Sequence, residues 1–490
     1  MVAHYADRPM SPASRFDPES FRSFRVTDRR FDPRSRTVTL RYALDDRVTF
    51  TETITFEGTP GSRGPAPSAP SDPDPAADPG IADPGPADPG PEDHLPPGLA
   101  RALLHLHVAA GTSYYKTAAP PEVVIEGESM GAAELDLHHH LYDDGLREFA
   151  VANGLPVPRP VAVVADHGVA DPPVPTAGAL RPGLIVPIGG GKDSMVLIDA
   201  VRHLRPRLFA VNPHPLVHLL AAEAGLELLV VRRKLDPGLA ALHEAGARNG
   251  HVPITAIVSL IAVVGAFLDG YDTVAMAVER SASEETVLVD GVPVNHQYSK
   301  SRDFELLLAD VIRSSVAPEL TYGSALRPYS ELAISRAFAR LGRYRGTFCS
   351  CNSAFRQRAG TEDRWCGHCP KCRFVGLMLA PFLEPDELTA VIGTDMFADP
   401  AQIDGFAALM SDVDKPFECV GEKRESAAAL LLLAGRPAWR STPVVSALAP
   451  LAATLVDDDE VVRLLGPDDE LTFGDPEVAA AVAALLAGGR

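Results

Sequence analysis

The sequence contains no hydrophobic run long enough to cross a membrane. Its longest apolar stretch covers residues 254–268, a length that suits a buried helix better than a bilayer span. Residues 1–9 also lack the apolar core of a secretory signal peptide. These absences argue against membrane-bound and exported proteins. We therefore expect a cytoplasmic protein without a membrane partner.

Positive charge is scarce as well. The 490 residues include 45 Lys and Arg but 65 Asp and Glu, which gives a formal net charge of −20. Binding to nucleic acids depends mainly on cationic side chains that neutralise phosphates. We therefore expect a small-molecule partner and no nucleic acid.

Cysteine is rare outside one short segment. Five of the six cysteines lie within residues 349–372, and clustered thiols in a chain without an export signal favour metal binding over disulfides. A Cys-x-x-Cys spacing can direct two thiolates to one tetrahedral ion. The pattern predicts a structural zinc site, with an iron–sulfur cluster as the alternative. The predicted ligands are Cys366, Cys369, Cys372 and Cys351, with Cys349 as the alternative to Cys351.

A glycine-rich turn follows a short apolar run. Residues 184–188 are typical of a buried strand, and residues 195–201 are typical of a helix. Glycines between a strand and a helix let the backbone approach an anion, and the helix start offers free N–H groups. The segment therefore predicts a phosphate-binding loop, the alternative being an ordinary glycine turn. Its candidate nucleotide-binding residues are Gly189, Gly190, Gly191, Lys192, Asp193 and Ser194.

Strands and helices alternate beyond this loop. The pattern predicts strands at 208–211, 226–231 and 273–278, and helices at 216–224 and 254–268. Such alternation favours an α/β fold with a doubly wound, mostly parallel sheet. Ligands of these sheets bind at the carboxyl ends of the strands. We therefore add Asn212 to the nucleotide-binding candidates and Glu279 to the catalytic or magnesium-binding candidates, although Glu279 also suits a solvated loop.

The remaining segments suggest supporting roles. Alternating apolar residues predict an amino-terminal hairpin from residues 38–44 and 48–56. Three consecutive histidines, residues 138–140, point in three directions on a predicted helix, so we expect a solvated helix face. The predicted divisions are a β-rich region (1–58), a disordered Pro/Gly/Asp-rich linker or insertion (59–97), a mixed α/β region (98–177), a nucleotide-binding domain with the cysteines (178–385) and a helical region (386–490).

Two further segments carry candidate acid–base groups. Residues 294–301 are rich in hydrogen-bonding side chains, including His296 and Lys300, and suit either a substrate site or an exposed loop. Cys419 stands apart from the other cysteines, shortly before a predicted helix at 426–434. A thiol there can act as a thiolate, whereas an isolated buried cysteine is usually inert.

Four stretches together carry a family resemblance: residues 187–194, 295–300, 351–372 and 416–421. The chain resembles the ATP-dependent UDP-N-acetylmuramoyl-L-alanyl-L-glutamate epimerases of bacterial peptidoglycan synthesis. It also resembles, more broadly, the pyrophosphate-loop ATP pyrophosphatases, although Gly189 stands where those loops usually have serine. The layout of the clustered cysteines resembles the zinc segment of 7-cyano-7-deazaguanine synthases.

The resemblance implies a reaction and its cofactors. The terminal L-glutamate of a UDP-muramoyl dipeptide would be inverted to D-glutamate while ATP is converted to AMP and diphosphate, with Mg²⁺ at the loop and a structural Zn²⁺. The catalytic candidates are Lys192, Asp193, Glu279, His296, Lys300 and Cys419. The alternatives are a deazaguanine synthase-like enzyme, a tRNA-modifying ligase, or a zinc-stapled binding module without activity.

Overall fold

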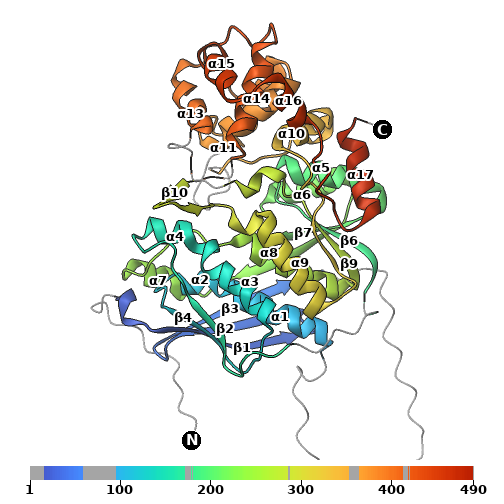
Figure 1. Cartoon of the computed structure of the whole chain (residues 1–490). Helices are drawn as coiled ribbons and strands as arrows, with labels where there is room; N and C mark the ends of the chain where they lie inside the picture. The colour runs from blue at the N-terminus through green and yellow to red at the C-terminus, as the bar shows by residue number, and fades with distance from the viewer. Residues whose placement is uncertain are drawn as a thin grey trace, which may run out of the picture.

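One large sheet organises the chain (Figure 1). The computed structural model describes residues 16–58, 95–171, 178, 180–284, 287–352, 364–411, 416, 418 and 420–488. The predicted linker therefore lies outside the described residues, apart from residues 95–97. The sheet has ten strands in the order β12-β9-β6-β7-β8-β3-β2-β1-β4-β5. Their bounds are β1 Ser23–Asp32, β2 Thr37–Leu44, β3 Val48–Phe56, β4 Glu122–Ile125, β5 Ala162–Ala165, β6 Arg181–Pro187, β7 Arg207–Val211, β8 Leu228–Lys234, β9 Tyr271–Met276 and β12 Thr321–Ser324.

The central strands form the expected parallel sheet. Strands β12, β9, β6, β7 and β8 pair in parallel. They are connected by helices that include α5 Lys192–Val201, α6 Pro215–Ala224, α7 Gly238–Glu244, α8 Ile254–Asp269 and α9 Arg302–Val311. The predicted α/β class with a mostly parallel sheet is confirmed. From β6 the chain adds β7 and β8 on one side of this strand and then adds β9 and β12 on its other side. The order in which strands are added therefore reverses between β6 and β9.

Alternation along the strands supplies two hydrophobic cores, one on each face of the sheet. Val186 and Leu208 belong to one core, while their neighbours Ile185 and Phe209 belong to the other. Because successive strand residues point to opposite faces, a strand covered on both sides needs apolar residues throughout. This explains the continuous apolar runs that the sequence shows at β6 and β7.

The amino-terminal hairpin is confirmed, and it extends the central sheet. Strands β2 and β3 pair antiparallel, and β3 also pairs antiparallel with β8, with Thr53 opposite Lys234. The sequence analysis did not predict β1. The register of β1 shifts between Val26 and Arg29, and this irregularity interrupts the alternation by which a strand is recognised. A small separate hairpin joins β10 Val287–Val289 to β11 Val292–Val294.

The histidine run on α3 (Ala132–Tyr142) corrects one expectation. A solvated face is wrong for His138, whose Nε2 lies 3.0 Å from Nδ1 of His105 in a buried contact with α1 (Pro97–Ala110). The other ring nitrogen of His105 contacts Glu134 at 3.0 Å. One of three consecutive helical residues faces the neighbouring helix, and here that residue is His138. Two short helices complete this region, α2 Thr112–Tyr115 and α4 Arg147–Ala152.

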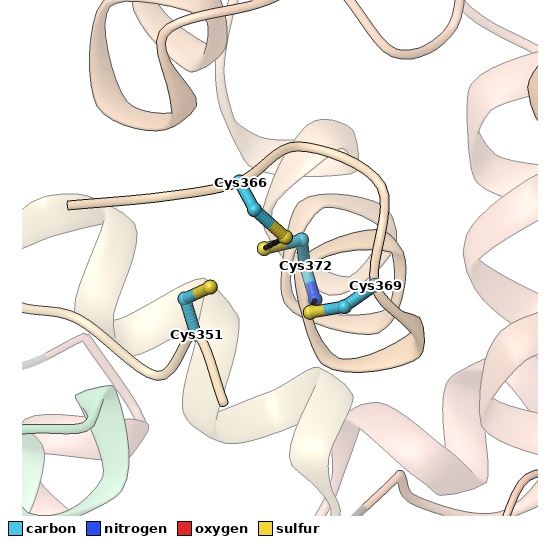
Figure 2. Close-up of side chains that lie close together, drawn as sticks. All are labelled: Cys351, Cys366, Cys369 and Cys372. Carbon is cyan, nitrogen blue, oxygen red and sulfur yellow. Dashed lines mark hydrogen bonds between the residues drawn. The ribbon is translucent and has the colours of Figure 1, made fainter. Parts of the chain in front are cut away.

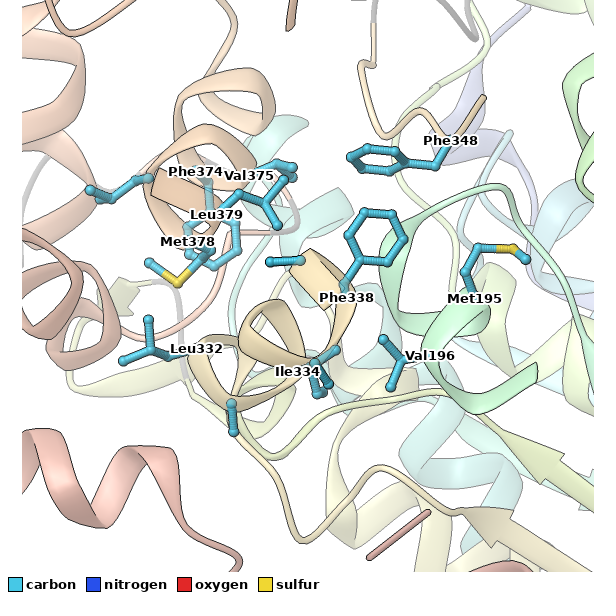
Figure 3. Packing of buried hydrophobic residues seen from close by; sticks show 14 of the residues in the cluster. Met195, Val196, Leu332, Ile334, Phe338, Phe348, Phe374, Val375, Met378 and Leu379 are labelled. Carbon is cyan, nitrogen blue, oxygen red and sulfur yellow. The ribbon is translucent and has the colours of Figure 1, made fainter. Parts of the chain in front are cut away.

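The carboxyl-terminal third is helical, as expected. Most of its helices gather beyond one end of the sheet, whereas the last one, Pro476–Leu486, lies beside α5 (Figure 1). They are α10 Glu331–Arg340, α11 Pro370–Leu379, α12 Pro385–Ile392, α13 Ile403–Ala407, α14 Lys423–Ala434, α15 Pro443–Leu455, α16 Asp458–Leu465 and α17 Pro476–Leu486. Figure 3 shows how α10 packs between the sheet region and the carboxyl-terminal helices. Phe338 of α10 lies between Val196 of α5 and Phe348, and the ring centroids of Phe338 and Phe348 are 4.5 Å apart. Among the described residues, no helix is both long and apolar enough to cross a membrane.

Candidate active site

A cleft of about 380 Å³ opens where the sheet topology reverses. It lies at the carboxyl ends of β6, β7 and β9, the edge at which doubly wound sheets bind their ligands. The lining combines polar loop residues with an apolar wall from α8 and the strand ends. The lining residues are Pro187–Gly189, Gly191, Asp193, Ser194, Phe209–Val211, Ile254, Thr255, Val258, Met276–Val278, Lys300, Cys349 and Ser350.

The glycine loop forms the floor of this cleft. Gly190 has a φ of 95°, a conformation that disfavours side chains, and the backbone N–H of Cys349 donates to its carbonyl oxygen at 3.0 Å. A Cβ at Gly191 would lie 3.0 Å from Oγ of Ser350. Helix α5 begins at Lys192, so its amino-terminal N–H groups face this loop. The loop is thus a strand-to-helix turn suited to an anion.

Lys192 does not extend into the cleft but is buried among carboxylates. Its Nζ lies 2.5 Å from Oδ1 of Asp193 and also pairs with the carboxylate of Glu331, the first residue of α10. One oxygen from each of Asp193, Glu279 and Glu331 lies within 4.8 Å of the others. Oxygen donors of this kind suit Mg²⁺. The sequence analysis missed Glu331.

The charges of this cluster are strongly coupled. Burial raises the pKa of Glu331 to about 7, and the charge of Asp193 adds to that rise. Burial would also raise the pKa of Asp193, but the charges of Lys192, Lys371 and Lys300, together with the hydrogen bond from Lys192, lower that pKa. Burial alone would lower the pKa of Lys192, yet the two carboxylates raise it. Lys192 and Asp193 are therefore ionised, while Glu331 titrates near neutrality.

Arg327, which follows β12, holds the loops that carry two of the predicted site residues. Its guanidinium donates to the backbone oxygens of Glu279 at 2.7 Å and of Lys300 at 2.8 Å. Lys300 lines the cleft and donates from Nζ to Gln297 at 2.9 Å. Asn212 is placed differently, because its side chain bonds the backbone of Arg233 and does not line the cleft.

His296 lies in a second polar cluster beside the cleft. Its Nδ1 lies 2.5 Å from Oε2 of Glu148, and Nδ1 of His251 lies 3.7 Å from the same oxygen. Burial lowers the pKa of His251 to about 4, with Glu148 opposing that change and His296 and Lys300 adding to it. His251 is therefore neutral at pH 7. The sequence analysis missed Glu148 and His251, which lie far from His296 in the chain.

The cysteines meet behind the glycine loop. Figure 2 shows Cys366, Cys369 and Cys372 around the start of α11, with Cys351 facing them. The four sulfurs lie within 4.8 Å of one another, and those of Cys366 and Cys372 are 3.7 Å apart. A hydrogen bond from Cys372 lowers the pKa of Cys369 to about 4, which provides a thiolate. Four sulfurs at these distances fit one tetrahedral ion.

Cys349 is engaged elsewhere. Its Sγ donates to the backbone oxygen of Arg364 at 2.8 Å, and burial raises the pKa of its thiol to about 11. The structure therefore brings Cys351, not Cys349, to the other three cysteines. The remaining catalytic candidate, Cys419, lies outside the described residues.

Comparisons with known proteins give the family. Family models described as the MurL N-terminal domain and the MurL C-terminal domain match residues 84–325 and 347–462. A protein of Salinispora tropica named UDP-N-acetyl-alpha-D-muramoyl-L-alanyl-L-glutamate epimerase is 46% identical over 71% of this chain and 77% of its own length. A protein of the same name from a Micromonospora species is 44% identical over 71% of this chain and 78% of its own length. Another, from Xanthomonas oryzae pv. oryzae, is 38% identical over 88% of this chain and 90% of its own length.

The chain belongs to the MurL family. The resemblance that the four stretches indicate is thereby confirmed. No solved structure matches the chain. The two MurL segments meet at the cleft, because the glycine loop of the first segment and Cys349 and Ser350 of the second segment all line it. Glu331 lies between the two matched segments, at the start of the helix that packs them together.

Proposed function

We propose that this chain is a UDP-N-acetyl-α-D-muramoyl-L-alanyl-L-glutamate epimerase, which inverts the terminal L-glutamate to D-glutamate in peptidoglycan precursor synthesis. The observation that carries this proposal is the likeness to relatives of that name, each covered over at least 77% of its length. Since ATP and a UDP-linked precursor are its substrates, the enzyme would act in the cytoplasm.

Activation of the carboxylate comes first in the proposed reaction. The α-proton of a carboxylate is very weakly acidic, because its removal places a second negative charge beside the first. An oxygen of the glutamate α-carboxylate therefore attacks the α-phosphorus of ATP, and diphosphate leaves. The resulting acyl-adenylate has lost the carboxylate charge, so its α-carbon is acidic enough to exchange.

The cleft supports this step and the proposed assignment to the pyrophosphate-loop enzymes. The apolar wall from Val258 and Phe209 suits an adenine ring, while Gly189, Gly191 and Ser194 suit phosphates. Asp193, Glu279 and Glu331 would hold Mg²⁺, which neutralises phosphate charge. Lys192 keeps Asp193 ionised beside that site.

Inversion requires a base on one face of the α-carbon and an acid on the other. One group removes the proton, a second returns a proton to the opposite face, and water then cleaves the acyl-adenylate to AMP and free carboxylate. Lys300, which lines the cleft, and Cys419 are the preferred pair. Glu279 and His296 are further candidates, with His296 the least favoured because Glu148 engages its Nδ1.

The four cysteines would hold a structural Zn²⁺. Cys351 follows Cys349 and Ser350, both of which line the cleft. An ion bound there would fix this segment to α11 and support the glycine loop from behind.

Turnover in deuterated water tests the proposal. With ATP, Mg²⁺ and the UDP-muramoyl dipeptide, we expect AMP and a D-glutamyl product that carries deuterium at the α-carbon. Omission of ATP should abolish the label, since only the activated acyl group exchanges. AMP release that does not depend on the dipeptide would contradict the epimerase function. A D-product without deuterium would retain that function but exclude this mechanism.

A further inference from the structure

Three chain segments bring a carboxylate and two imidazoles together beside the cleft. Glu148 comes from α4, His251 precedes α8, and His296 follows β11. One ligand atom from each residue lies within 4.8 Å of the other two. The two imidazole rings lie 4.7 Å apart, with their planes at 44°.

A single hydrogen bond does not explain this arrangement. Nδ1 of His296 already lies within hydrogen-bond distance of Oε2 of Glu148. Nδ1 of His251 faces the same oxygen from 3.7 Å, which is too far for a hydrogen bond. Two ring nitrogens are therefore directed to one carboxylate oxygen, and only one of them is needed to satisfy it.

The position of the cluster points toward substrate. All three side chains are partly buried, with exposed fractions of 19% for Glu148, 24% for His251 and 15% for His296. His251 precedes the cleft residue Ile254 by three positions, and His296 precedes Lys300 by four. The cluster thus borders the cleft on the side of α8, apart from the cysteines.

We propose that Glu148, His251 and His296 form a binding site for one divalent transition-metal ion, distinct from the four-cysteine site. Two imidazoles and one carboxylate are a donor set that Zn²⁺, Mn²⁺, Fe²⁺ and Co²⁺ accept. Three protein ligands leave a coordination position for water or for an oxygen atom of substrate. Because Lys300 lies close by, the ion and this lysine together would suit an anionic group of the substrate.

Cobalt binding by the full-length chain tests the site. The protein is stripped with a chelator, loaded with Co²⁺ and dialysed, and bound cobalt is measured by elemental analysis and visible absorption. A thiolate site gives an intense sulfur-to-cobalt charge-transfer band, whereas a site of nitrogen and oxygen ligands gives only weak bands. We expect His251→Gln and His296→Gln each to bind one ion fewer than the wild type while the charge-transfer band is unchanged.

Two controls make the result decisive. His218→Gln, at an exposed histidine on α6, should bind as much cobalt as the wild type. If a histidine variant does not fold, as judged by circular dichroism, Glu148→Gln takes its place. Equal cobalt content in the wild type and the folded cluster variants would overturn the proposal. Unchanged cobalt with lost deuterium exchange would instead assign the cluster to proton transfer. The cobalt measurement requires no turnover, so it stands apart from the epimerase assignment.

Discussion

Lys192 and Glu331 form a buried ion pair across 139 residues of sequence. Their side chains are exposed by only 2% and 3%, and the pair connects the first turn of α5 to the first turn of α10. The glycine loop and the helical region are therefore joined by charge as well as by the apolar contacts in Figure 3. Loss of the cation at Lys192 should therefore affect both the loop and the packing behind it.

Glu331→Gln should impair activation while the fold is retained. The amide has the same size, and Lys192 keeps Asp193 as its partner, but one candidate Mg²⁺ ligand is lost. We expect AMP formation to fall about a hundredfold, the order of effect seen when one charge-stabilising group is removed from an active site. Rates measured across a Mg²⁺ titration check this. Glu387→Gln, an exposed carboxylate on α12, serves as the control, and equal rates in both variants would exclude a role for Glu331.

Lys192→Met is the complementary change at the same pair. It leaves the buried carboxylate of Glu331 and the partly buried carboxylate of Asp193 without this cation, which should destabilise the fold by about 3 kcal/mol. Urea unfolding monitored by circular dichroism measures the difference. A variant as stable as the wild type would show that the pair contributes nothing to the link between α5 and α10.

Cys369→Ser and Cys349→Ser should distinguish a cysteine that binds the metal ion from a cysteine that is only buried nearby. Cys369 belongs to the four-sulfur set, whereas Cys349 donates to Arg364 and lies outside it. We expect Cys369→Ser to lose about one Zn²⁺ per chain together with stability, and Cys349→Ser to keep the ion. Elemental analysis and thermal unfolding decide between them. Stoichiometric iron with a visible charge-transfer band would indicate a cluster instead of zinc.

The buried histidines should make the protein sensitive to acid. Burial lowers the pKa of His107 from its ordinary value of 6.5 to about 3, while its Nε2 donates to the backbone oxygen of Arg41. Below pH 6.5 this histidine is protonated in the unfolded chain but stays neutral in the folded chain. The free energy of unfolding therefore decreases as the pH falls below 6.5. Burial also lowers the pKa of His105 and His138, which adds to the same trend.

His107→Gln isolates one part of this effect. The amide retains a hydrogen-bond donor but does not titrate, so the loss of stability between pH 6.5 and pH 4 should shrink by roughly 3 kcal/mol. Urea unfolding at several pH values measures the slope of the unfolding free energy against pH. His218→Gln, at an exposed position, should leave the slope unchanged. An identical slope in the wild type, His107→Gln and His218→Gln would mean that His107 is not buried in its neutral form.

Cys419→Ala and Lys300→Ala should divide activation from proton transfer. A variant that still releases AMP but forms no D-isomer has lost an acid or a base and not the nucleotide site. We expect this result for Cys419→Ala above all, because a cysteine can remove a proton as a thiolate and return one as a thiol. Chiral analysis of the product and AMP release are measured in the same reactions. Full epimerisation by both variants would assign the proton transfer to other groups.

The sequence by itself determined the features that depend on near neighbours. The glycine loop between β6 and α5, the β2–β3 hairpin and the spacing of Cys366, Cys369 and Cys372 are local, because each follows from residues a few positions apart. Four such motifs were also sufficient to indicate the family. The irregular strand β1 was missed because its register shift breaks the alternation on which that prediction relies.

Only the tertiary structure decided which distant groups meet. Glu331 joins Asp193 and Glu279 because β12 lies beside β9, a strand order that no local pattern states. Glu148 on α4, His251 before α8 and His296 after β11 come together from three separate segments, and His138 is buried because α3 packs against α1. A charged or polar side chain carries no periodic signal that identifies its partner. Its environment is fixed by the packing of the apolar faces around it, and so the chemistry of this site depends on the whole fold.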